Sequence, residues 1–205
     1  IVFKGTNTWI RVDTLSGGKL DLEASLDLAT TDATLNVSSI INQSVWHHVL
    51  MTYTDDSDDE IELYVDGILV GTSTNGDGAP AGTDTNNLLI AGTTTNNFDG
   101  FIDDLRVYQY ARTVDEIKAD YNAGLAAKFG GSPNQDINRG LVGYWDFEEG
   151  TGQTTNDSSD SNNDGTLGAD SSVGTDDPAW TSGKAGMGGA LNLTVNDFVN
   201  IGDSA

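Results

Sequence analysis

The residues with the clearest capacity for chemistry lie between positions 156 and 165. This stretch, Asn156-Asp157-Ser158-Ser159-Asp160-Ser161-Asn162-Asn163-Asp164-Gly165, holds three carboxylates and three amides within ten residues. Calcium takes about six to eight oxygen ligands, often from flexible loops, and this composition supplies such oxygens. The spacing is not that of an EF-hand loop, because no Glu stands at the twelfth position. Composition alone leaves two interpretations open, a calcium loop and a solvated turn, and slightly favours the turn.

Two further groups of residues have types that suit metal binding. The acidic run Asp55-Asp56-Ser57-Asp58-Asp59-Glu60 joins two predicted strands, and its like charges repel one another. We therefore interpret it as a solvated loop that discourages edge association, with a weak cation site as the alternative. His47 and His48 are neighbours on a predicted strand, so they point to opposite faces and cannot hold one metal ion together. One of them is predicted to make a buried hydrogen bond.

Charge and composition exclude several classes of partner. The 205 residues include 32 Asp plus Glu against 9 Lys plus Arg, which gives a net charge of −23. Such a chain lacks the basic patch that nucleic acid binding requires, and acidic membrane surfaces repel it. No apolar run approaches the roughly 18 residues of a spanning helix, so no membrane insertion is expected. The absence of Cys excludes disulfides, thiolate metal sites and Cys nucleophiles. The many Asp, Thr, Asn and Gly residues indicate a secreted protein.

The elements that must position these residues are short strands. Runs rich in Val, Ile, Leu, Thr and aromatic residues recur between clusters of Gly, Asn, Asp and Ser, a pattern typical of a β-sandwich. The predicted strands cover residues 1–4, 8–13, 19–26, 34–40, 47–54, 60–65, 68–74, 88–92, 100–108, 142–147, 162–167, 189–193 and 197–201. The dipeptide Asp66-Gly67 predicts a tight type I′ hairpin between two of them.

A single short helix is predicted over about 113–122. Thr113 and Glu116 have the spacing of a capping box, and Gly124 follows the expected end of the helix. After the helix the composition shifts to Gly, Ser, Pro, Asn and Ala without periodicity, so residues 130–139 are predicted to form a linker.

Three segments, in this order and followed by the predicted helix, resemble the laminin-G-like jelly roll of the concanavalin A-like group. They are Trp46–Tyr53, Leu63–Gly67 and Phe98–Tyr108. Later stretches are similar to the beginning of the same domain type: Leu141–Gly150, Asp157–Leu167 and Asp197–Ile201. The resemblance implies an all-β fold, an antiparallel two-sheet jelly-roll β-sandwich with one short helix. The chain departs from the family at Tyr110 and Arg112, where Arg and Leu are more usual.

The two halves of the family's domain stand here in permuted order. Residues 1–128 resemble its C-terminal half, 129–140 form the linker, and 141–205 resemble its N-terminal half. Two interpretations stay open: one circularly permuted domain, or an excerpt from a tandem array cut in mid-domain. One strand of the family is missing between Ala205 and Ile1, so we expect the chain to be a piece of a longer protein.

The resemblance also implies metal ligands. Family members often hold calcium with the loop after the opening strand and an acid from the strand at 102–103. The ligands implied here are Asp157, Asn162 and Asp103 first, and then Asn163 and Asp164.

Catalysis is not expected. Glu60 and Glu62 share one face of a predicted strand, as do the acids of glycosidases in the same fold group. Those enzymes resemble the pattern Glu-x-Asp-x-x-Glu, and Val65 stands where the last acid belongs. Trp9 and Trp180 lie near loop-rich stretches and are weak candidates for sugar-stacking platforms, with half-buried packing as the alternative.

The sequence therefore predicts a non-catalytic structural or adhesion module of an extracellular or cell-surface protein, stabilised by calcium. Its predicted partners are neighbouring copies of itself or adjacent repeats, in head-to-tail contact. The alternative is a carbohydrate-binding module of a secreted polysaccharide-active protein, whose partners are glycans.

Overall fold

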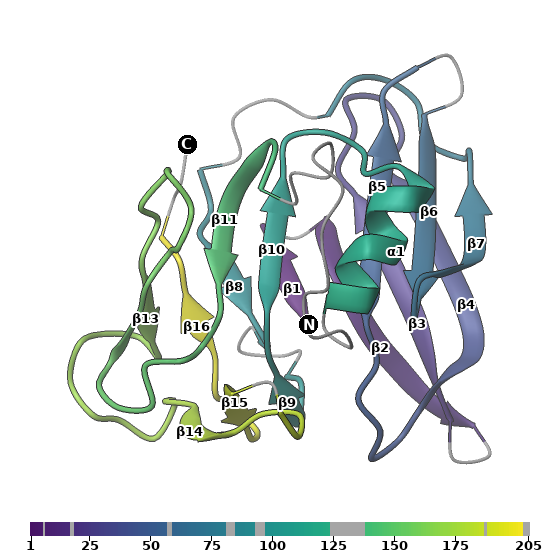
Figure 1. The fold of residues 1–205 in the computed structure, drawn as a ribbon. Helices are drawn as coiled ribbons and strands as arrows, with labels where there is room; N and C mark the ends of the chain where they lie inside the picture. The colour runs from purple at the N-terminus through teal and green to yellow at the C-terminus, as the bar shows by residue number, and fades with distance from the viewer. Residues whose placement is uncertain are drawn as a thin grey trace. The chain divides into compact units, whose positions relative to one another are not determined.

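The computed structural model describes residues 1–5, 7–16, 19–56, 59–80, 85–92, 97–123, 138–186 and 188–202. Antiparallel strands are its main secondary structure and one helix accompanies them, so the predicted jelly-roll β-sandwich class is confirmed (Figure 1). The chain divides into two compact units. The first contains Ile1–Arg11, Thr83–Val107 and Leu141–Ala205, and the second contains Val12–Gly82 and Tyr108–Gly140. Most of the predicted linker, residues 129–137, lies outside the described residues.

The first unit is built from strands that precede and strands that follow the predicted linker. They are β1 (Val2–Lys4), the start of β2 (Thr8–Ser16), β8 (Leu88–Ile90), β9 (Gly100–Ile102), β10 (Leu105–Tyr108, whose last residue belongs to the second unit), β11 (Leu141–Trp145), β12 (Thr154–Thr155), β13 (Gly165–Leu167), β14 (Ala179–Ser182), β15 (Gly189–Leu193) and β16 (Val199–Asn200). The strand orders are β12-β13-β16-β8-β1-β2, β14-β15-β9 and β10-β11. Early strands thus pair directly with late ones: β8 with β16, and β9 with β15.

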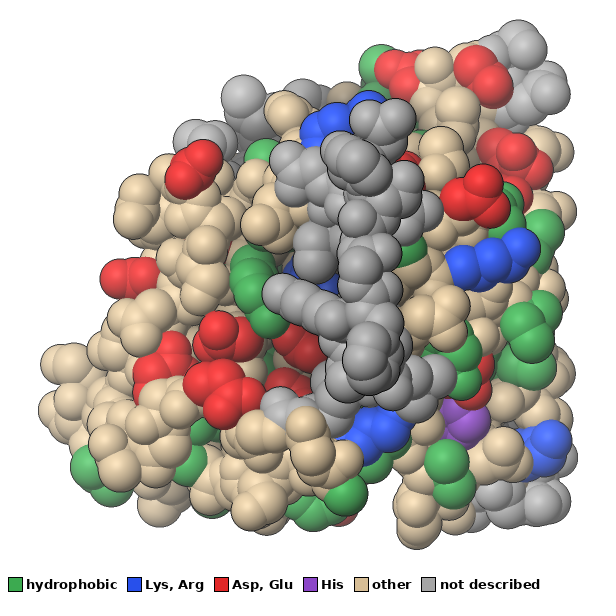
Figure 2. All heavy atoms as spheres, viewed as in Figure 1, with side chains coloured by type: hydrophobic (Ala, Val, Ile, Leu, Met, Phe, Trp, Pro, Cys, Tyr) green, Lys and Arg blue, Asp and Glu red, His purple; other side chains and the backbone are tan. Residues whose placement is uncertain are grey.

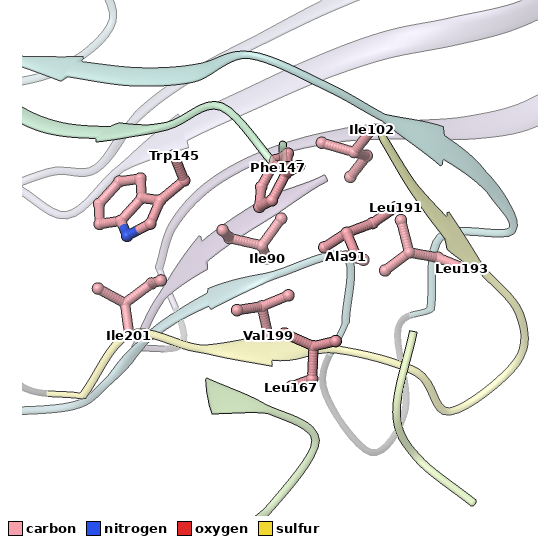
Figure 3. Close-up of a cluster of buried hydrophobic side chains, with 10 residues drawn as sticks. All are labelled: Ile90, Ala91, Ile102, Trp145, Phe147, Leu167, Leu191, Leu193, Val199 and Ile201. Carbon is pink, nitrogen blue, oxygen red and sulfur yellow. The ribbon is translucent and has the colours of Figure 1, made fainter. Parts of the chain in front are cut away.

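A hydrophobic core fills this first unit (Figure 3). Alternation along the strands produces it, because Leu191 and Leu193 of β15 share one face, as do Val199 and Ile201. The buried side chains are Ile90, Ala91, Ile102, Trp145, Phe147, Leu167, Leu191, Leu193, Val199 and Ile201. The indole N–H of Trp145 donates to the carbonyl of Asn163 at 2.9 Å, which satisfies the one polar atom of this side chain.

The second unit contains the end of β2 and the strands β3 (Lys19–Leu26), β4 (Ala33–Asn42), β5 (Val49–Thr54), β6 (Glu60–Val65) and β7 (Ile68–Ser73), with the helix α1 (Val114–Ala123). Strand β3 pairs with β4, and β5-β6-β7 form a separate antiparallel sheet. Strands β4 and β7 pack closely, because a Cβ atom at Gly71 would lie 2.7 Å from Val37 Cγ2. Only glycine fits at that point.

The predicted hairpin between β6 and β7 is confirmed. Asp66 and Gly67 have φ angles of 53° and 75°, as a type I′ turn requires. The Asp66 carboxylate also contacts the histidine pair: Oδ2 lies 2.8 Å from His47 Nδ1, and Oδ1 accepts from the backbone N–H of His48 at 3.0 Å. The predicted histidine hydrogen bond is therefore made by His47, whose side chain is 10% exposed.

One predicted strand is wrong in a way that matters for the site. Residues 100–108 were expected to form a single strand, but the structure breaks it into β9 and β10 at Asp103 and Asp104. Asp104 has a φ angle of 55°, which interrupts the ladder. The prediction from the sequence also missed the short strands β12 and β14.

The predicted helix and its capping box are confirmed. The hydroxyl of Thr113 accepts from the N–H of Glu116 at 3.4 Å, and the Glu116 carboxylate accepts from the N–H of Thr113 at 2.8 Å. Among the described residues, no helix has the length and apolar character needed to cross a membrane.

Replacing Glu116 with Ala should cost about 1 kcal/mol of stability, the usual cost of losing a cap. The hydrogen bond from the Thr113 N–H lowers the Glu116 pKa from 4.5 to about 2. A lowered pKa means that this stabilisation is fully present above pH 4.5 and is lost as the pH falls from 4.5 towards 2. Urea unfolding at neutral and acidic pH measures both effects. Asp115→Ala, in the same helical turn, is the control, and an equal loss in both variants would contradict the capping role.

Candidate functional site

The break between β9 and β10 places two consecutive acids in different settings. The Asp104 carboxylate accepts from the Tyr144 hydroxyl at 2.7 Å and from the Arg106 guanidinium at 3.2 Å. Arg106 in turn lies over the Tyr144 ring, 4.4 Å from its centre. Arg106 therefore neutralises Asp104, whereas no ion pair neutralises Asp103 within the described part of the chain.

Asp103 lies in a cluster of acids, which we call the acidic cluster: Asp103, Asp104, Asp146 and Glu148. Partial burial of the Asp103 carboxyl raises its pKa from 3.8 to about 7, and repulsion from Asp104, Glu148 and Asp146 adds to the shift. Figure 2 shows Asp and Glu side chains gathered on the viewed face over the lower ends of β10 and β11. A positive charge placed here would relieve this repulsion.

Glycines of the β14–β15 hairpin bring two of these carboxylates together. The N–H of Gly183 donates to the carbonyl of Gly188 at 2.9 Å, so these two glycines are neighbours in space. A Cβ atom at Gly183 would lie 2.8 Å from Asp103 Oδ2, and one at Gly188 would overlap the Glu148 carboxylate. The hairpin thus forms a cradle that side chains would fill.

The groups around this cradle carry oxygen atoms. Asp103 and Glu148 contribute carboxylates, and the backbone carbonyls of Gly189 and Phe147 lie close beside the glycines. The N–H of Gly189 donates to Glu148 Oε2 at 3.0 Å and fixes that side chain. Carboxylate and carbonyl oxygens are the ligands that calcium prefers. Carboxylate and carbonyl oxygens thus lie close to one another here, although no group of three or more His, Asp or Glu side chains arranged to hold a metal is found in the described ranges.

Asp157, the first of the predicted calcium ligands, accepts hydrogen bonds from backbone N–H groups and a hydroxyl. Asp157 is 7% exposed. Its Oδ1 accepts from the N–H groups of Tyr144 and Ser159, and Oδ2 accepts from the N–H of Asn163 and the hydroxyl of Ser159, all at 2.9 Å. Burial raises the Asp157 pKa, but the hydrogen bonds outweigh burial and leave it below its ordinary value. The carboxylate already has a donor for each of its main acceptor directions.

The remaining predicted ligands of the loop bind one another or the backbone. Asp164 accepts from the N–H of Asp157 at 2.9 Å, and the Asn163 amide donates to the carbonyl of Val142 at 3.3 Å. The amide of Asn162, which is exposed, donates to the carbonyl of Asp160 at 3.0 Å. The structure thus gathers Asp157, Asn163 and Asp164 into one network. No hydrogen bond joins Asp103 to that network among the described residues.

Sequence reasoning missed Asp146 and Glu148. Both follow the β11 strand and are separated only by Phe147, whose φ angle of 53° ends the extended course of the chain. That spacing was the available signal. Their proximity to Asp103 depends on how β9, β11 and β15 assemble, which no local pattern contains.

Neither predicted sugar platform offers two open faces. The Arg11 guanidinium lies over the Trp9 ring, 4.3 Å from its centre. Trp180 packs partly against the core, and its indole N–H donates to the carbonyl of Gly152 at 2.9 Å. A pocket of about 390 Å³ lies near Trp9. Phe3 lines this pocket, and Phe3 pairs with Trp9 between strands β1 and β2. The other lining residues are Gly5, Thr85, Asn86, Asn87 and Leu89.

Glu62 of β6 makes structural contacts. Glu62 accepts from the Thr52 hydroxyl at 3.2 Å and from the Tyr64 hydroxyl at 2.9 Å. Burial and this bond to Glu62 raise the Tyr64 pKa to about 12, so the phenol stays a hydrogen-bond donor.

Comparison with known proteins gives one family match. A laminin-G model of the concanavalin A-like lectin/glucanase superfamily matches residues 1–118, more than half of the chain. No curated protein and no solved structure matches. Residues 141–205, which resemble the N-terminal half of the laminin-G-like domain, lie outside the matched range.

Proposed function

The chain belongs to the concanavalin A-like lectin/glucanase superfamily, and this membership indicates a structural or carbohydrate-binding module. We propose that the chain is a non-catalytic structural module of an extracellular protein, and that calcium stabilises it. The observation that carries the proposal is the placement of the Asp103 and Glu148 carboxylates against the glycines of the β14–β15 hairpin, beside backbone carbonyls. The raised pKa of Asp103, which comes from its partial burial and from the neighbouring acids, supports it. The acidic composition supports the extracellular location. The contacts of Glu62 with Thr52 and Tyr64 support the absence of catalysis.

Calcium would stabilise the fold by joining segments that are distant in sequence. Asp103 and Glu148 would hold it, with the backbone carbonyls of Gly189 and Phe147 close by. When bound, the ion supplies positive charge that cancels the repulsion among the carboxylates. Through the ion, Asp103 would connect the end of β9 to the β14–β15 hairpin. Glu148 would connect the chain after β11 to the same hairpin.

A chelator should lower the stability of the protein, and added calcium should restore it. A ligand that binds only the folded state adds about 2.7 kcal/mol at 100 times its dissociation constant. Asp103→Asn should remove most of this response and, in chelator, should itself stabilise the protein because it removes a repelled charge. Asp170→Asn, a change of an exposed acid in the same unit, is the control. Thermal unfolding with and without calcium measures the response, and identical curves would reject the proposal.

The pH dependence in chelator gives a second measurement on the same site. The folded pKa of Asp103 is about 7 against an ordinary value of 3.8, so the folded form keeps a proton that the unfolded form releases. The free energy of unfolding should therefore fall as the pH rises from 3.8 to about 7. Asp103→Asn should flatten this dependence.

The second candidate function is carbohydrate binding, and the pocket lined by Phe3, Asn87 and Leu89 is the observation that favours it. Its mix of apolar and amide side chains suits a sugar. Binding on a glycan array that Asn87→Ala abolishes would favour this candidate. Association with neighbouring copies belongs to the structural proposal, and sedimentation velocity over a range of concentrations tests it.

A further inference from the structure

His47 has a hydrogen-bond partner at each nitrogen of its ring. Nδ1 lies 2.8 Å from Asp66 Oδ2, in the turn between β6 and β7. Nε2 lies 3.2 Å from the backbone nitrogen of Asn42, the last residue of β4, and accepts its N–H. The side chain of His47 is 10% exposed. One imidazole ring thus joins the end of β4 to the β6–β7 hairpin.

The two partners of His47 require one particular protonation state of the ring. An ionised carboxylate only accepts hydrogen bonds, so Nδ1 must carry a hydrogen atom. A backbone N–H only donates, so Nε2 must present its lone pair. Both hydrogen bonds therefore exist together only in the neutral ring whose proton is on Nδ1.

Protonation of Nε2 would change the two hydrogen bonds in opposite directions. The N–H of Asn42 would then face another N–H at 3.2 Å, and this hydrogen bond would be lost. The bond to Asp66 would join an imidazolium to a carboxylate and would become stronger, because both groups are charged. Asn42 is exposed, so water can accept the hydrogen bond of its N–H. Acid would therefore release one partner of His47 and hold the other more tightly.

The bond that acid would break closes a short loop. Residues 43–46 lie between Asn42 and His47, and the side chains of residues 43–45 are exposed. Burial of these three side chains therefore contributes little to holding the loop in place. Strand β4 is the last in its sheet order and pairs with β3 alone among the described strands. The Asn42–His47 bond is thus an important tie between the loop and the end of β4.

Other titratable groups lie on the elements around His47. His48, the next residue, has its ring 6.0 Å from the ring of Tyr121 in α1. Lys19 of β3 pairs with the last residue of β4. Asp66 is the one acid paired with His47 in the described part of the chain. Any test must therefore distinguish His47 from His48, which is a side chain of the same type.

We propose that His47 is an acid-sensitive latch. When Nε2 takes up a proton, the loop of residues 43–46 opens at the end of β4, while the β6–β7 hairpin stays closed. Histidine is the side-chain type that commonly changes charge between about pH 5 and 8, so a mild change of pH is enough to operate such a latch. The proposal does not depend on calcium, because Asn42, His47 and Asp66 all belong to the second unit.

Nuclear magnetic resonance of the isotope-labelled full chain, in chelator, tests the latch. At about pH 8, long-range proton–nitrogen spectra should show the ring proton of His47 on Nδ1. As His47 is protonated, the protection of the Asn42 amide against hydrogen exchange, relative to its intrinsic rate at each pH, should fall about fivefold, the factor that one hydrogen bond of ordinary strength provides. The Asp66 amide, which donates to the His48 carbonyl at 2.8 Å, is the internal control and should keep its protection.

Two variants each keep one of the two contacts of His47. In His47→Gln the longer amide can reach the position of Nε2 and accept from the Asn42 N–H, so Asn42 should stay protected at both pH values. In His47→Asn the shorter amide can donate to Asp66 but does not reach Asn42, so protection of Asn42 should be low at both. A fall in protection that persists in His47→Gln would assign the effect to His48 or another group and overturn the proposal. A proton on Nε2 at about pH 8, constant protection of Asn42, or an equal loss at Asn42 and Asp66 would overturn it as well.

Discussion

Replacing Asp120 with Ala is expected to destabilise the protein by about 3–5 kcal/mol, the range found when one partner of a buried ion pair is removed. Asp120 and Arg112 are each 5% exposed. Arg112 Nη2 donates to both oxygens of Asp120, at 2.8 and 2.9 Å, and Nε donates to Oδ2 at 3.1 Å. The change would leave the buried guanidinium with a single acidic partner among the described residues, Glu116, whose Oε1 lies 3.6 Å from Arg112 Nη1.

The surroundings of Arg112 make relaxation into water difficult. Its guanidinium lies over the Tyr108 ring at 4.2 Å and donates to the Tyr110 hydroxyl at 2.8 Å. Tyr110 in turn donates to Glu116 at 2.8 Å, so the pair is connected to the helix cap. Tyr110 and Arg112 thus belong to one network with Glu116 and Asp120.

Urea unfolding at neutral pH measures the effect of Asp120→Ala. The double variant Arg112→Met/Asp120→Leu is the informative control, because replacing both charges with apolar groups of similar size often recovers stability. A loss below about 1 kcal/mol in Asp120→Ala would show that the pair behaves like an exposed one.

Replacing Asp157 with Ala should cost roughly 3 kcal/mol or more, because the backbone N–H groups of Tyr144, Ser159 and Asn163 would lose their acceptor. Since the folded pKa of Asp157 is lowered, its contribution is fully present above its ordinary pKa of 3.8 and is lost as the pH falls below that value.

Measuring Asp157→Ala in chelator and in calcium separates two roles of this residue. If its hydrogen bonds carry the stability, the loss is equally large in both conditions. If the loss disappears in chelator, Asp157 acts as a calcium ligand, as the family resemblance implies. Ser158→Ala, a neighbouring change whose hydroxyl lies 3.5 Å from Asp146, is the control and should have a small effect.

Features determined by neighbouring residues were predictable from the sequence. The Asp66-Gly67 turn and the Thr113–Glu116 cap depend on at most four consecutive residues, and both are confirmed. The break at Asp104 was not predictable in this way. Its φ angle of 55° is supported by a hydrogen bond from Tyr144, which lies 40 residues further along the chain.

The candidate site shows the same limit. Composition identified the loop at 156–165 as rich in oxygens, but it does not tell whether a carboxylate faces backbone N–H groups or an ion. For Asp157 the structure provides the N–H groups. Only the family resemblance, and no local pattern, indicated Asp103 as a calcium ligand. Its neighbours Asp146 and Glu148 come from the other side of the predicted linker, so only the assembled strands bring the three acids together.

The pairing of early strands with late ones determines when the first unit can form during synthesis. Val199 pairs with Ile90, and Leu191 pairs with Ile102, so these ladders close over about a hundred residues of intervening chain. Strands β8 and β9 leave the ribosome long before β15 and β16 exist. Until then their edges are unpaired and the apolar residues around Ile90 are exposed to water. Folding of this unit is therefore expected to wait until β15 and β16 have emerged, whereas the hairpin of β6 and β7 can form as soon as it emerges.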